Sequence, residues 1–228
     1  MAKKTNKTEE KIVAVEEALS LTERFIEKNK NVLSIIIAVI IVIVLAYFGF
    51  KKMYLAPLEK EAQSQMYMAE MYFEQDSLSR ALFGDGNELG FLDIIDDYGM
   101  TKSANLAHYY AGICYLNLGE YKVAIDYLED FNASGQILGP MAIGAIGDAY
   151  MELGESEKAA NCYVNAADEN NNDFTSPTFL FKAGWTYEIM GDYKKALKVY
   201  ETIKKDYPQS YEAREIDKFI SKAKALSK

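Results

Sequence analysis

Residues 111–124 read AGICYLNLGEYKVA, and the same pattern returns twice further along the chain. Residues 146–159 read IGDAYMELGESEKA, and residues 183–196 read AGWTYEIMGDYKKA. All three copies share the frame G-x-x-Y-x-x-x-G-x-x-x-x-A, and they begin 35 and 37 residues apart. Self-similarity with a period of this length predicts an array of stacked helix pairs, because each pair buries its apolar face against the next.

Each position of the frame has a physical role in a helix pair. The first glycine lets the first helix approach the second closely, and the tyrosine fills the space beside it one helical turn later. The second glycine ends the first helix, because the left-handed conformation found there is least costly for glycine. The alanine is small because the second helix crosses the first there. In chain order these residues are Gly112, Tyr115, Gly119 and Ala124; Gly147, Tyr150, Gly154 and Ala159; and Gly184, Tyr187, Gly191 and Ala196.

The frame resembles the tetratricopeptide repeat (TPR), a helix-turn-helix unit of 34 residues. Three copies cover residues 105–210. Residues 57–104 resemble a degenerate first helix pair with a glycine-rich insert, since FLDIIDDYG at 91–99 aligns with YETIKKDYP at 200–208. Residues 211–228 carry an apolar stripe with lysines opposite and are expected to form a capping helix. The resemblance therefore implies an all-α, TPR-like α-solenoid of helix pairs with a C-terminal capping helix.

The degenerate first pair departs from the family at the turn glycine and at the small alanine. We expect Pro57–Leu82 to be one helix and Gly84–Gly90 to be a loop, since closely placed glycines and an asparagine disfavour a helix. The loop sequence GDGNELG does not predict phosphate or calcium binding. No strand precedes it, no P-loop lysine follows it, and the aspartate spacing of a calcium loop is missing.

Residues 32–50, VLSIIIAVIIVIVLAYFGF, contain no charged side chain. At about 1.5 Å per residue this run makes a helix roughly 28 Å long, close to the hydrocarbon thickness of a bilayer. It predicts a single N-terminal transmembrane helix ahead of the repeats. Its 31-residue prefix, its length and the absence of an A-x-A-like site favour an uncleaved anchor over a cleaved signal peptide.

Residues 1–31 form a polar tail, which we expect to be disordered to about Thr8 and amphipathic beyond it, with a helix restarting at Ser20–Glu23. A docking role for this tail and a solvated helix without a partner remain equally open. Three basic residues lie near each end of the apolar run, whereas the whole tail holds seven. Because long domains cross a membrane largely regardless of charge, we predict a cytoplasmic N-terminus and a repeat domain outside.

The formal net charge of −9 is unevenly distributed. The tail has a net charge of +1, and Lys51 and Lys52 add two positive charges, so the remaining chain carries −12. A strongly acidic domain repels phosphate backbones, which makes protein partners a better prediction than nucleic acid. Cys114 and Cys162 lie 48 residues apart without a CxxC motif, so we interpret them as buried thiols and leave their pairing open.

The sequence contains no recognisable catalytic or metal-binding motif. The single histidine, His108, occupies a position where the next two copies have Ile143 and Leu180, which predicts a packed side chain. GxSxG, HExxH and Walker motifs are absent. We therefore predict a protein that is not an enzyme and that uses no cofactor or metal.

Binding in a helical-repeat array takes place on its concave face, which the first helices of the pairs line. The predicted lining combines apolar anchors with carboxylates and lacks basic side chains, so it suits an extended or helical peptide with apolar and basic side chains. Packing of the same residues against the cap or the first helix pair is the alternative. If the groove positions of the TPR family carry over, the lining is Tyr109, Ile113, Leu116 and Asn117; Asp148, Met151 and Glu152; and Phe181, Trp185, Glu188 and Ile189.

A short tail, one span and an acidic TPR domain together resemble the bacterial YfgM family of inner-membrane proteins. The resemblance implies a periplasmic TPR domain that associates with the SecYEG translocon and with PpiD, a membrane-anchored periplasmic chaperone. The protein would then be an ancillary translocon subunit that recruits chaperones to emerging polypeptides. Two alternatives remain: a cytosol-facing TPR receptor or assembly scaffold, and a hydrolase or lectin built on the repeats.

Overall fold

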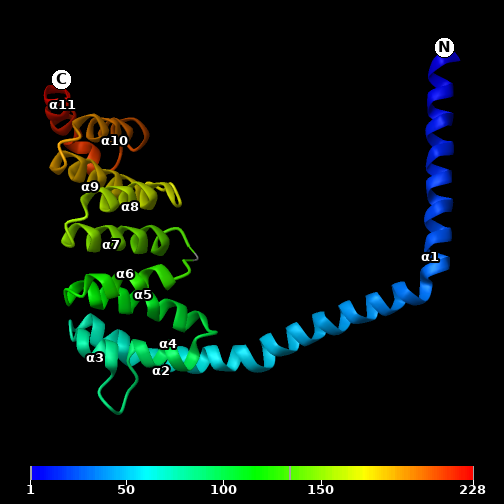
Figure 1. Ribbon diagram of the computed structural model, residues 1–228, viewed down its shortest axis with the longest axis horizontal. Helices are drawn as coiled ribbons and strands as arrows, with labels where there is room; N and C mark the ends of the chain where they lie inside the picture. The colour runs from blue at the N-terminus through cyan, green and yellow to red at the C-terminus, as the bar shows by residue number, and fades with distance from the viewer. Residues whose placement is uncertain (1, 134, 228) are drawn as a thin grey trace. The chain divides into compact units, whose positions relative to one another are not determined.

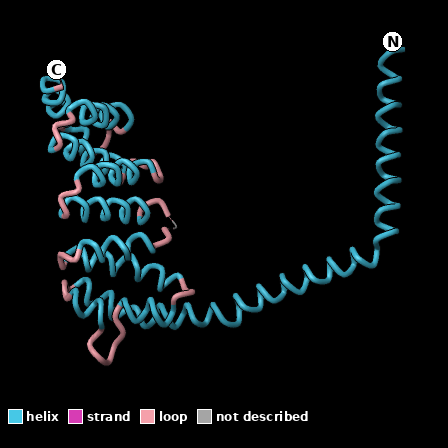
Figure 2. Tube along the Cα trace, viewed as in Figure 1, coloured by secondary structure: helices cyan, strands magenta, loops and turns pink. Residues whose placement is uncertain are grey.

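The computed structural model describes residues 2–133 and 135–227, and every regular element within these ranges is helical (Figures 1 and 2). The chain divides into two compact units, Met1–Pro57 and Leu58–Lys228. Each unit is described by itself below.

The first unit is a long helix. Helix α1 runs from Ala2 to Phe50, and the backbone continues through a π-helical segment, η1 (Lys51–Leu55), into α2 (Ala56–Glu74). The expectations of a disordered start and of a helix restart at Ser20 are both wrong, because α1 is helical from Ala2 without a break. A π-helical turn widens the helix locally.

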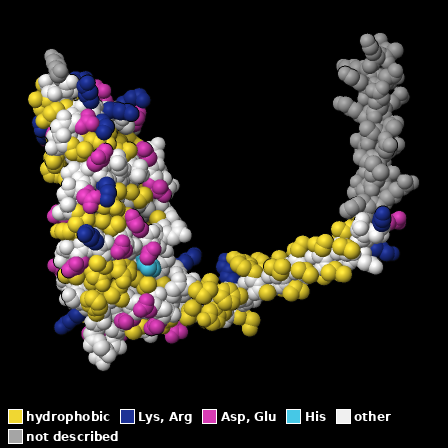
Figure 3. All heavy atoms as spheres, in the orientation of Figure 1, with side chains coloured by type: hydrophobic (Ala, Val, Ile, Leu, Met, Phe, Trp, Pro, Cys, Tyr) yellow, Lys and Arg dark blue, Asp and Glu magenta, His cyan; other side chains and the backbone are white. Residues whose placement is uncertain are grey.

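The apolar run within this helix has the properties of a membrane span. The helical segment from Ile26 to Glu74 contains a window with a mean hydropathy of 3.1, none of which is buried by protein. Large side chains such as Ile35 and Leu45 are each 65% exposed, and Figure 3 shows the hydrophobic side chains along this helix. The segment is therefore long and apolar enough to cross a bilayer, as the sequence predicts.

The second unit begins with a helix pair whose second helix is interrupted. Helix α2 ends at Glu74 rather than at Leu82, and α3 (Leu78–Phe83) follows a turn in which Asp76 has a φ of +57°. The expected single helix over Pro57–Leu82 is thus wrong. The glycine-rich loop separates α3 from α4 (Phe91–Tyr98), and α2, α3 and α4 share one buried cluster with α5 (Lys102–Asn117).

The glycine-rich loop closes on itself. The Asp85 carboxylate accepts hydrogen bonds from the amides of Asn87 and Glu88 and from the hydroxyl of Tyr72, 2.8 Å away. A Cβ on Gly90 would lie 2.2 Å from the carbonyl oxygen of Leu82, so the two ends of the loop approach as closely as glycine allows.

Three helix pairs and a final helix follow in order. They are α5 with α6 (Tyr121–Asp130), α7 (Leu138–Glu152) with α8 (Ser156–Asp168), and α9 (Ser176–Ile189) with α10 (Tyr193–Asp206). After a short 3-10 helix, η2 (Glu212–Arg214), α11 (Ile216–Leu226) ends the described chain. Each helix packs on the next, and Figure 1 shows the stack from α5 to α11.

The packing explains why the frame has these residue types. The turn glycines Gly119, Gly154 and Gly191 have φ values of +82°, +77° and +77°, the left-handed conformation that favours glycine. The crossing alanines Ala124, Ala159 and Ala196 are fully buried. The fold class predicted from the frame is therefore confirmed.

The first glycine of each frame is required by a close helix crossing. A Cβ on Gly112 would lie 2.5 Å from Cγ of Leu128, and the same atom on Gly147 would lie 2.7 Å from Cε1 of Tyr163. The frame is thus the sequence signature of a paired-helix contact that repeats along the stack.

Candidate peptide-binding surface

The predicted groove residues lie on α5, α7 and α9, the first helices of the three repeats. The structure divides them into two sets. The exposed set is Asn117, Glu152, Trp185 and Ile189. The buried or half-buried set is Tyr109, Ile113, Leu116, Asp148, Met151, Phe181 and Glu188.

The apolar residues of the first repeat contact the second repeat. Tyr109, Ile113 and Leu116 pack against a buried cluster that contains residues of both α6 and α7. The rings of Tyr109 and Phe131 are 5.4 Å apart, and burial raises the pKa of the Tyr109 hydroxyl. These side chains hold α5 against α6 and α7, whereas the alternative left open by the sequence was packing against the cap or the first helix pair.

Asp148 of α7 forms a polar network with two neighbouring helices. Its carboxylate oxygens accept hydrogen bonds from Nζ of Lys182 in α9 at 2.7 and 2.8 Å. The Tyr163 hydroxyl in α8 donates to the same carboxylate at 2.6 Å. Burial and, after it, this hydrogen bond raise the pKa of Tyr163, so its hydroxyl remains a donor. The Asp148 and Lys182 side chains are 38% and 37% exposed, which places their ion pair at the surface between α7 and α9.

Glu188 of α9 is paired with the final helix. Its side chain is 6% exposed, and one carboxylate oxygen accepts a hydrogen bond from Nζ of Lys222 in α11 at 2.6 Å. The ion pair raises the pKa of Lys222. Within the described residues, the other carboxylate oxygen and the Tyr200 hydroxyl are buried and have no hydrogen-bond partner.

The expectation that the groove lacks basic side chains is wrong. Lys182 and Lys222 neutralise two of its three predicted carboxylates, and the third, Glu152, accepts a hydrogen bond from the Tyr121 hydroxyl at 3.3 Å. Sequence reasoning missed both lysines because a lysine on an amphipathic helix usually faces solvent. Only the packing of neighbouring helices shows which carboxylate each one meets.

Trp185 and Ile189 form the exposed apolar part of this surface. They are one helical turn apart on α9, and their side chains are 58% and 55% exposed. The opposite face of α9 buries Ala183 and Tyr187, so this exposure is a property of one face. A large aromatic side chain beside an aliphatic one is the composition of an interface anchor.

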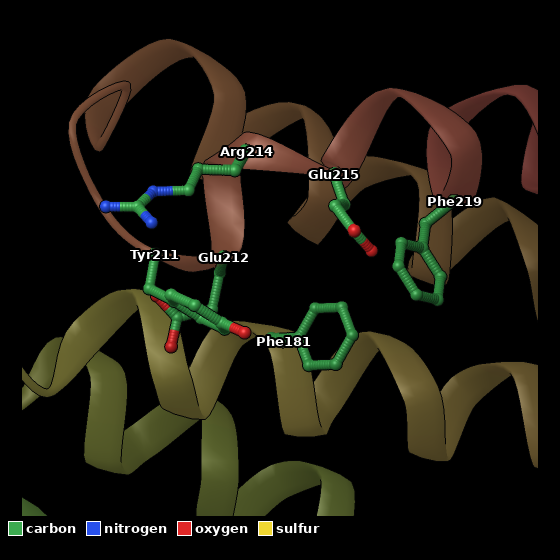
Figure 4. A pocket seen from close by; sticks show the side chains of 6 residues that line it. All are labelled: Phe181, Tyr211, Glu212, Arg214, Glu215 and Phe219. Carbon is green, nitrogen blue, oxygen red and sulfur yellow. The ribbon is translucent and has the colours of Figure 1, made fainter.

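Phe181 lines a pocket that the sequence did not predict. Its ring lies edge-on to that of Phe219 in α11, with centroids 4.9 Å apart, and the pocket between α9, η2 and α11 has a volume of about 400 Å³. In Figure 4 the Glu215 side chain points toward the space between the two rings, while the guanidinium of Arg214 lies over Tyr211. Glu212 also lines the pocket. The connection between α10 and α11 carries Tyr211, Glu212, Arg214 and Glu215. Only the tertiary structure reveals that this connection lies beside Phe181.

The single histidine of the chain lies outside this surface. His108 is half-buried beside Tyr127, with ring centroids 5.9 Å apart, and burial lowers its pKa. Among the side chains that the structure describes, those of residues 26–133 and 135–227, no three from His, Cys, Asp or Glu gather as a metal site. The surface described above offers apolar contact and hydrogen bonds, which are the interactions by which proteins bind one another.

Comparison with known proteins identifies the repeats. Tetratricopeptide repeat models match residues 106–133, 142–173 and 179–210, so the chain contains TPR repeats where the frame predicts them. No curated protein matches the chain.

Two solved structures are similar in fold. A crystal structure of MamA protein has a TM-score of 0.50 and 18% identity, covering 72% of this chain and 91% of that one. A crystal structure of nearly identical TPR-like repeats from a putative kinesin light chain of Podosopora anserina has a TM-score of 0.54 and 13% identity, covering 74% and 87%. At these identities the likeness establishes a TPR-like solenoid, a fold that is typically a non-enzymatic scaffold for protein binding.

Proposed function

We propose that the protein is a membrane-anchored TPR module that binds protein partners on the extracytoplasmic face of a bacterial inner membrane. Its role there is that of an ancillary subunit which recruits chaperones to polypeptides leaving the SecYEG translocon, with a chaperone such as PpiD as one partner. The TPR repeats and the apolar helix support the general architecture. The translocon role rests on the resemblance of that architecture to the YfgM family.

The observation that carries the binding function is the exposed pair Trp185 and Ile189 on α9. An exposed tryptophan on a helix whose opposite face is buried is the kind of side chain that dominates interface energetics. Because Lys182 and Lys222 neutralise two neighbouring carboxylates, the partner segment is selected here mainly by its apolar side chains.

The membrane side is supported by the sequence on either side of the apolar run. The tail is short and holds seven basic residues, whereas the repeat domain is long and acidic, and long domains translocate largely regardless of their charge. The equal number of basic residues close to the two ends of the run favours no side, and it keeps a cytosol-facing receptor or scaffold as the second candidate.

Protease protection of the full chain separates these two candidates. With a C-terminal epitope tag, the proposed topology predicts that protease added to spheroplasts removes the tag while the inner membrane is still intact. Digestion only after rupture of that membrane would place the repeat domain in the cytosol and exclude the extracytoplasmic role.

Site-specific photocrosslinking tests the binding surface in the membrane. A photoreactive amino acid at Trp185 should crosslink to a translocon or chaperone component, whereas the same amino acid at Lys198, exposed on α10, should not. In addition, Trp185→Ala with Ile189→Ala should reduce recovery of that component about tenfold or more, as expected for hot-spot residues that the partner buries on binding. Equal recovery by this variant and by Lys198→Ala would contradict the assignment.

A further inference from the structure

The pocket between α9, η2 and α11 has walls of three aromatic rings and two carboxylates. Phe181 comes from α9, Phe219 from α11, and Tyr211 from the residue that precedes η2. The rings of the two phenylalanines stand at 87° to each other. The volume of about 400 Å³ is within the range of about 300–1,000 Å³ that is usual for ligand pockets. We call this space the aromatic pocket.

The two carboxylates of the aromatic pocket come from Glu212 and Glu215. Oε1 of Glu212 accepts a hydrogen bond from the Thr178 hydroxyl in α9 at 2.7 Å, which holds η2 against α9. Figure 4 shows the Glu215 side chain pointing toward the space between the two phenylalanine rings. Carboxylates beside aromatic rings are a combination that stabilises a cation, because the ring faces and the carboxylates both carry negative charge.

Cations of the chain itself already lie against two of the three rings. Nζ of Lys218 is 5.1 Å from the ring centroid of Phe219 and pairs with the Glu215 carboxylate. The guanidinium of Arg214 is 5.4 Å from the ring centroid of Tyr211. The Lys218 and Glu215 side chains are 60% and 71% exposed, so their ion pair contributes little to stability and either group can turn away. The pocket can therefore exchange an internal cation for an incoming one.

A guanidinium suits these walls better than an apolar group does. An apolar ligand would remove the Glu215 carboxylate from water without supplying a counter charge, which costs free energy. The guanidinium of arginine is planar, stacks on aromatic rings, donates two parallel hydrogen bonds to a carboxylate and is more weakly hydrated than an ammonium. Among the described residues that line the pocket only Arg214 is basic, and in Figure 4 its guanidinium lies away from the two phenylalanine rings. The space beside these rings is therefore left to a ligand.

The aromatic pocket lies beside the exposed anchor of the candidate surface. Phe181 and Trp185 are four residues apart on α9, so their side chains are neighbours on one face of the helix. A partner segment whose apolar side chain covers Trp185 therefore brings an adjacent side chain to the pocket.

We infer that the aromatic pocket binds an arginine side chain of the partner segment whose apolar residues cover Trp185. The guanidinium lies against the rings of Phe181 and Phe219 and replaces the Lys218 ammonium at Glu215. This inference rests on the proposed function, because it takes the Trp185 surface as the place where a partner binds. It adds a charge requirement to a surface that otherwise selects apolar side chains.

The test uses the full chain in dodecyl maltoside, an uncharged detergent, and fluorescein-labelled peptides of the sequence Gly-Ser-Leu-Xaa-Leu-Ser-Gly. Xaa is arginine, lysine, norleucine or citrulline, which has nearly the shape of arginine without its charge. Fluorescence anisotropy should show the arginine peptide binding about fivefold more tightly than the citrulline and norleucine peptides, and about twofold more tightly than the lysine peptide. Equal binding of the arginine and citrulline peptides, or no binding of the arginine peptide up to about 1 mM, would overturn the inference.

A charge-neutral variant tests the carboxylates of the pocket. Glu212→Gln with Glu215→Gln should bring the arginine and citrulline affinities within about twofold of each other, since a glutamine amide still accepts the Thr178 hydrogen bond but carries no charge. The matched control is Glu201→Gln with Asp217→Asn, which removes two exposed carboxylates outside the pocket and should leave the arginine preference unchanged. An unchanged preference in the pocket variant would overturn the inference.

Trp185→Ala separates the pocket from the proposed function. It should weaken the arginine and citrulline peptides by the same factor, about tenfold, and leave the ratio of their affinities unchanged. Loss of the arginine preference in the natural protein, with the Trp185 dependence retained, would overturn the pocket assignment alone. A retained preference without any effect of Trp185→Ala would support the arginine pocket and count against the Trp185 surface.

Other occupants of the pocket would give different results. Benzoylphenylalanine in place of Tyr211 should crosslink to the arginine peptide, whereas the same amino acid in place of Lys198, exposed on α10, should not. Tightest binding by the norleucine peptide would assign the pocket to an apolar side chain. A dimer in analytical ultracentrifugation that Glu212→Gln with Glu215→Gln dissociates would assign it to a second copy. Either of these two outcomes would overturn the inference.

Discussion

At the scale of single residues, each repeat needs glycine for two different reasons, one conformational and one steric. Gly191 is needed for its φ of +77°, and a Cβ there would meet nothing within 4 Å. Gly184 is needed for space, because a Cβ there would lie 2.3 Å from Cε1 of Tyr200. Tyr200, on α10, is itself fully buried and its ring lies by those of Phe181 and Phe219, so it has little room to move.

Gly184→Ala should therefore destabilise the repeat unit by overpacking, by about 1–3 kcal/mol. Urea unfolding of the full chain in detergent, followed by circular dichroism, measures this change. Gly99→Ala is the control, since Gly99 has a helical φ of −51° and the nearest atom to its Cβ would be 3.2 Å away. Equal stability of the two variants would show that α9 and α10 are not held as closely as described.

The thiols show how burial decides reactivity at this scale. Cys114 is fully buried, and burial raises its pKa to about 12, while burial also raises the pKa of the half-buried Cys162. Both thiols therefore remain protonated near neutral pH, where the thiolate is the reactive form. Both thiols are free in the structure.

At the scale of elements, a side-chain cap marks the start of two helices, α5 and α10. The Thr101 hydroxyl accepts a hydrogen bond from the amide of Ala104 at 3.0 Å at the start of α5. Asp192 does the same for the amide of Lys195 at 3.1 Å at the start of α10. The hydrogen bond from the Lys195 backbone amide is the main cause that lowers the pKa of Asp192.

The Asp192 cap makes the stability of α10 depend on pH. Because the folded pKa lies below the unfolded one, the contribution is present above about pH 4 and is lost as pH falls through the folded pKa. Asp192→Ala should therefore destabilise the protein by about 0.5–1 kcal/mol at pH 7 and by progressively less at lower pH. Thermal unfolding of both proteins between pH 3 and pH 7 measures the difference.

Asp192→Asn is the control for this cap. An asparagine side chain still accepts the hydrogen bond from the Lys195 amide but does not titrate over this range. Its stability relative to Asp192→Ala should stay constant as pH falls. A constant difference between the natural protein and Asp192→Ala would instead show that the carboxylate charge is not what stabilises the start of α10.

At the scale of the whole molecule, the chain joins an apolar helix to a repeat unit with its own core. Between Val32 and Phe50 every residue is exposed except Leu33 and Gly49, which are half-buried, so protein packing does not account for the apolar composition. The repeat unit buries its apolar side chains in three clusters that follow one another along the stack. Membrane attachment is therefore expected to depend on α1 and not on the repeats.

Ile40→Arg with Ile41→Arg should release the protein from the membrane. Each arginine near the centre of a span costs about 2.5–3.5 kcal/mol of insertion free energy. Carbonate extraction of membranes, with detection of the protein in the supernatant and pellet, measures the change. Ile40→Leu with Ile41→Leu is the matched control and should stay in the pellet, whereas retention of the arginine variant would show attachment through another part of the chain.

The sequence alone determined the features that depend on local geometry or on chain length. The frame residues predict the TPR repeats because a left-handed turn, a close helix crossing and a small contact each admit only one or two residue types. The apolar run predicts the candidate span because its length matches a bilayer. Sequence reasoning failed at Asp76, where a non-glycine residue with a positive φ ends α2, and at the tail, where helix replaces expected disorder.

Only the tertiary structure decided what each surface presents. Whether Asp148 and Glu188 are free or paired depends on Lys182 and Lys222, each 34 residues away in the chain. The exposure of Trp185 and the pocket at Phe181 likewise depend on how successive helices stack. The physical reason is that burial and charge pairing arise between helices, whereas periodicity describes one helix at a time.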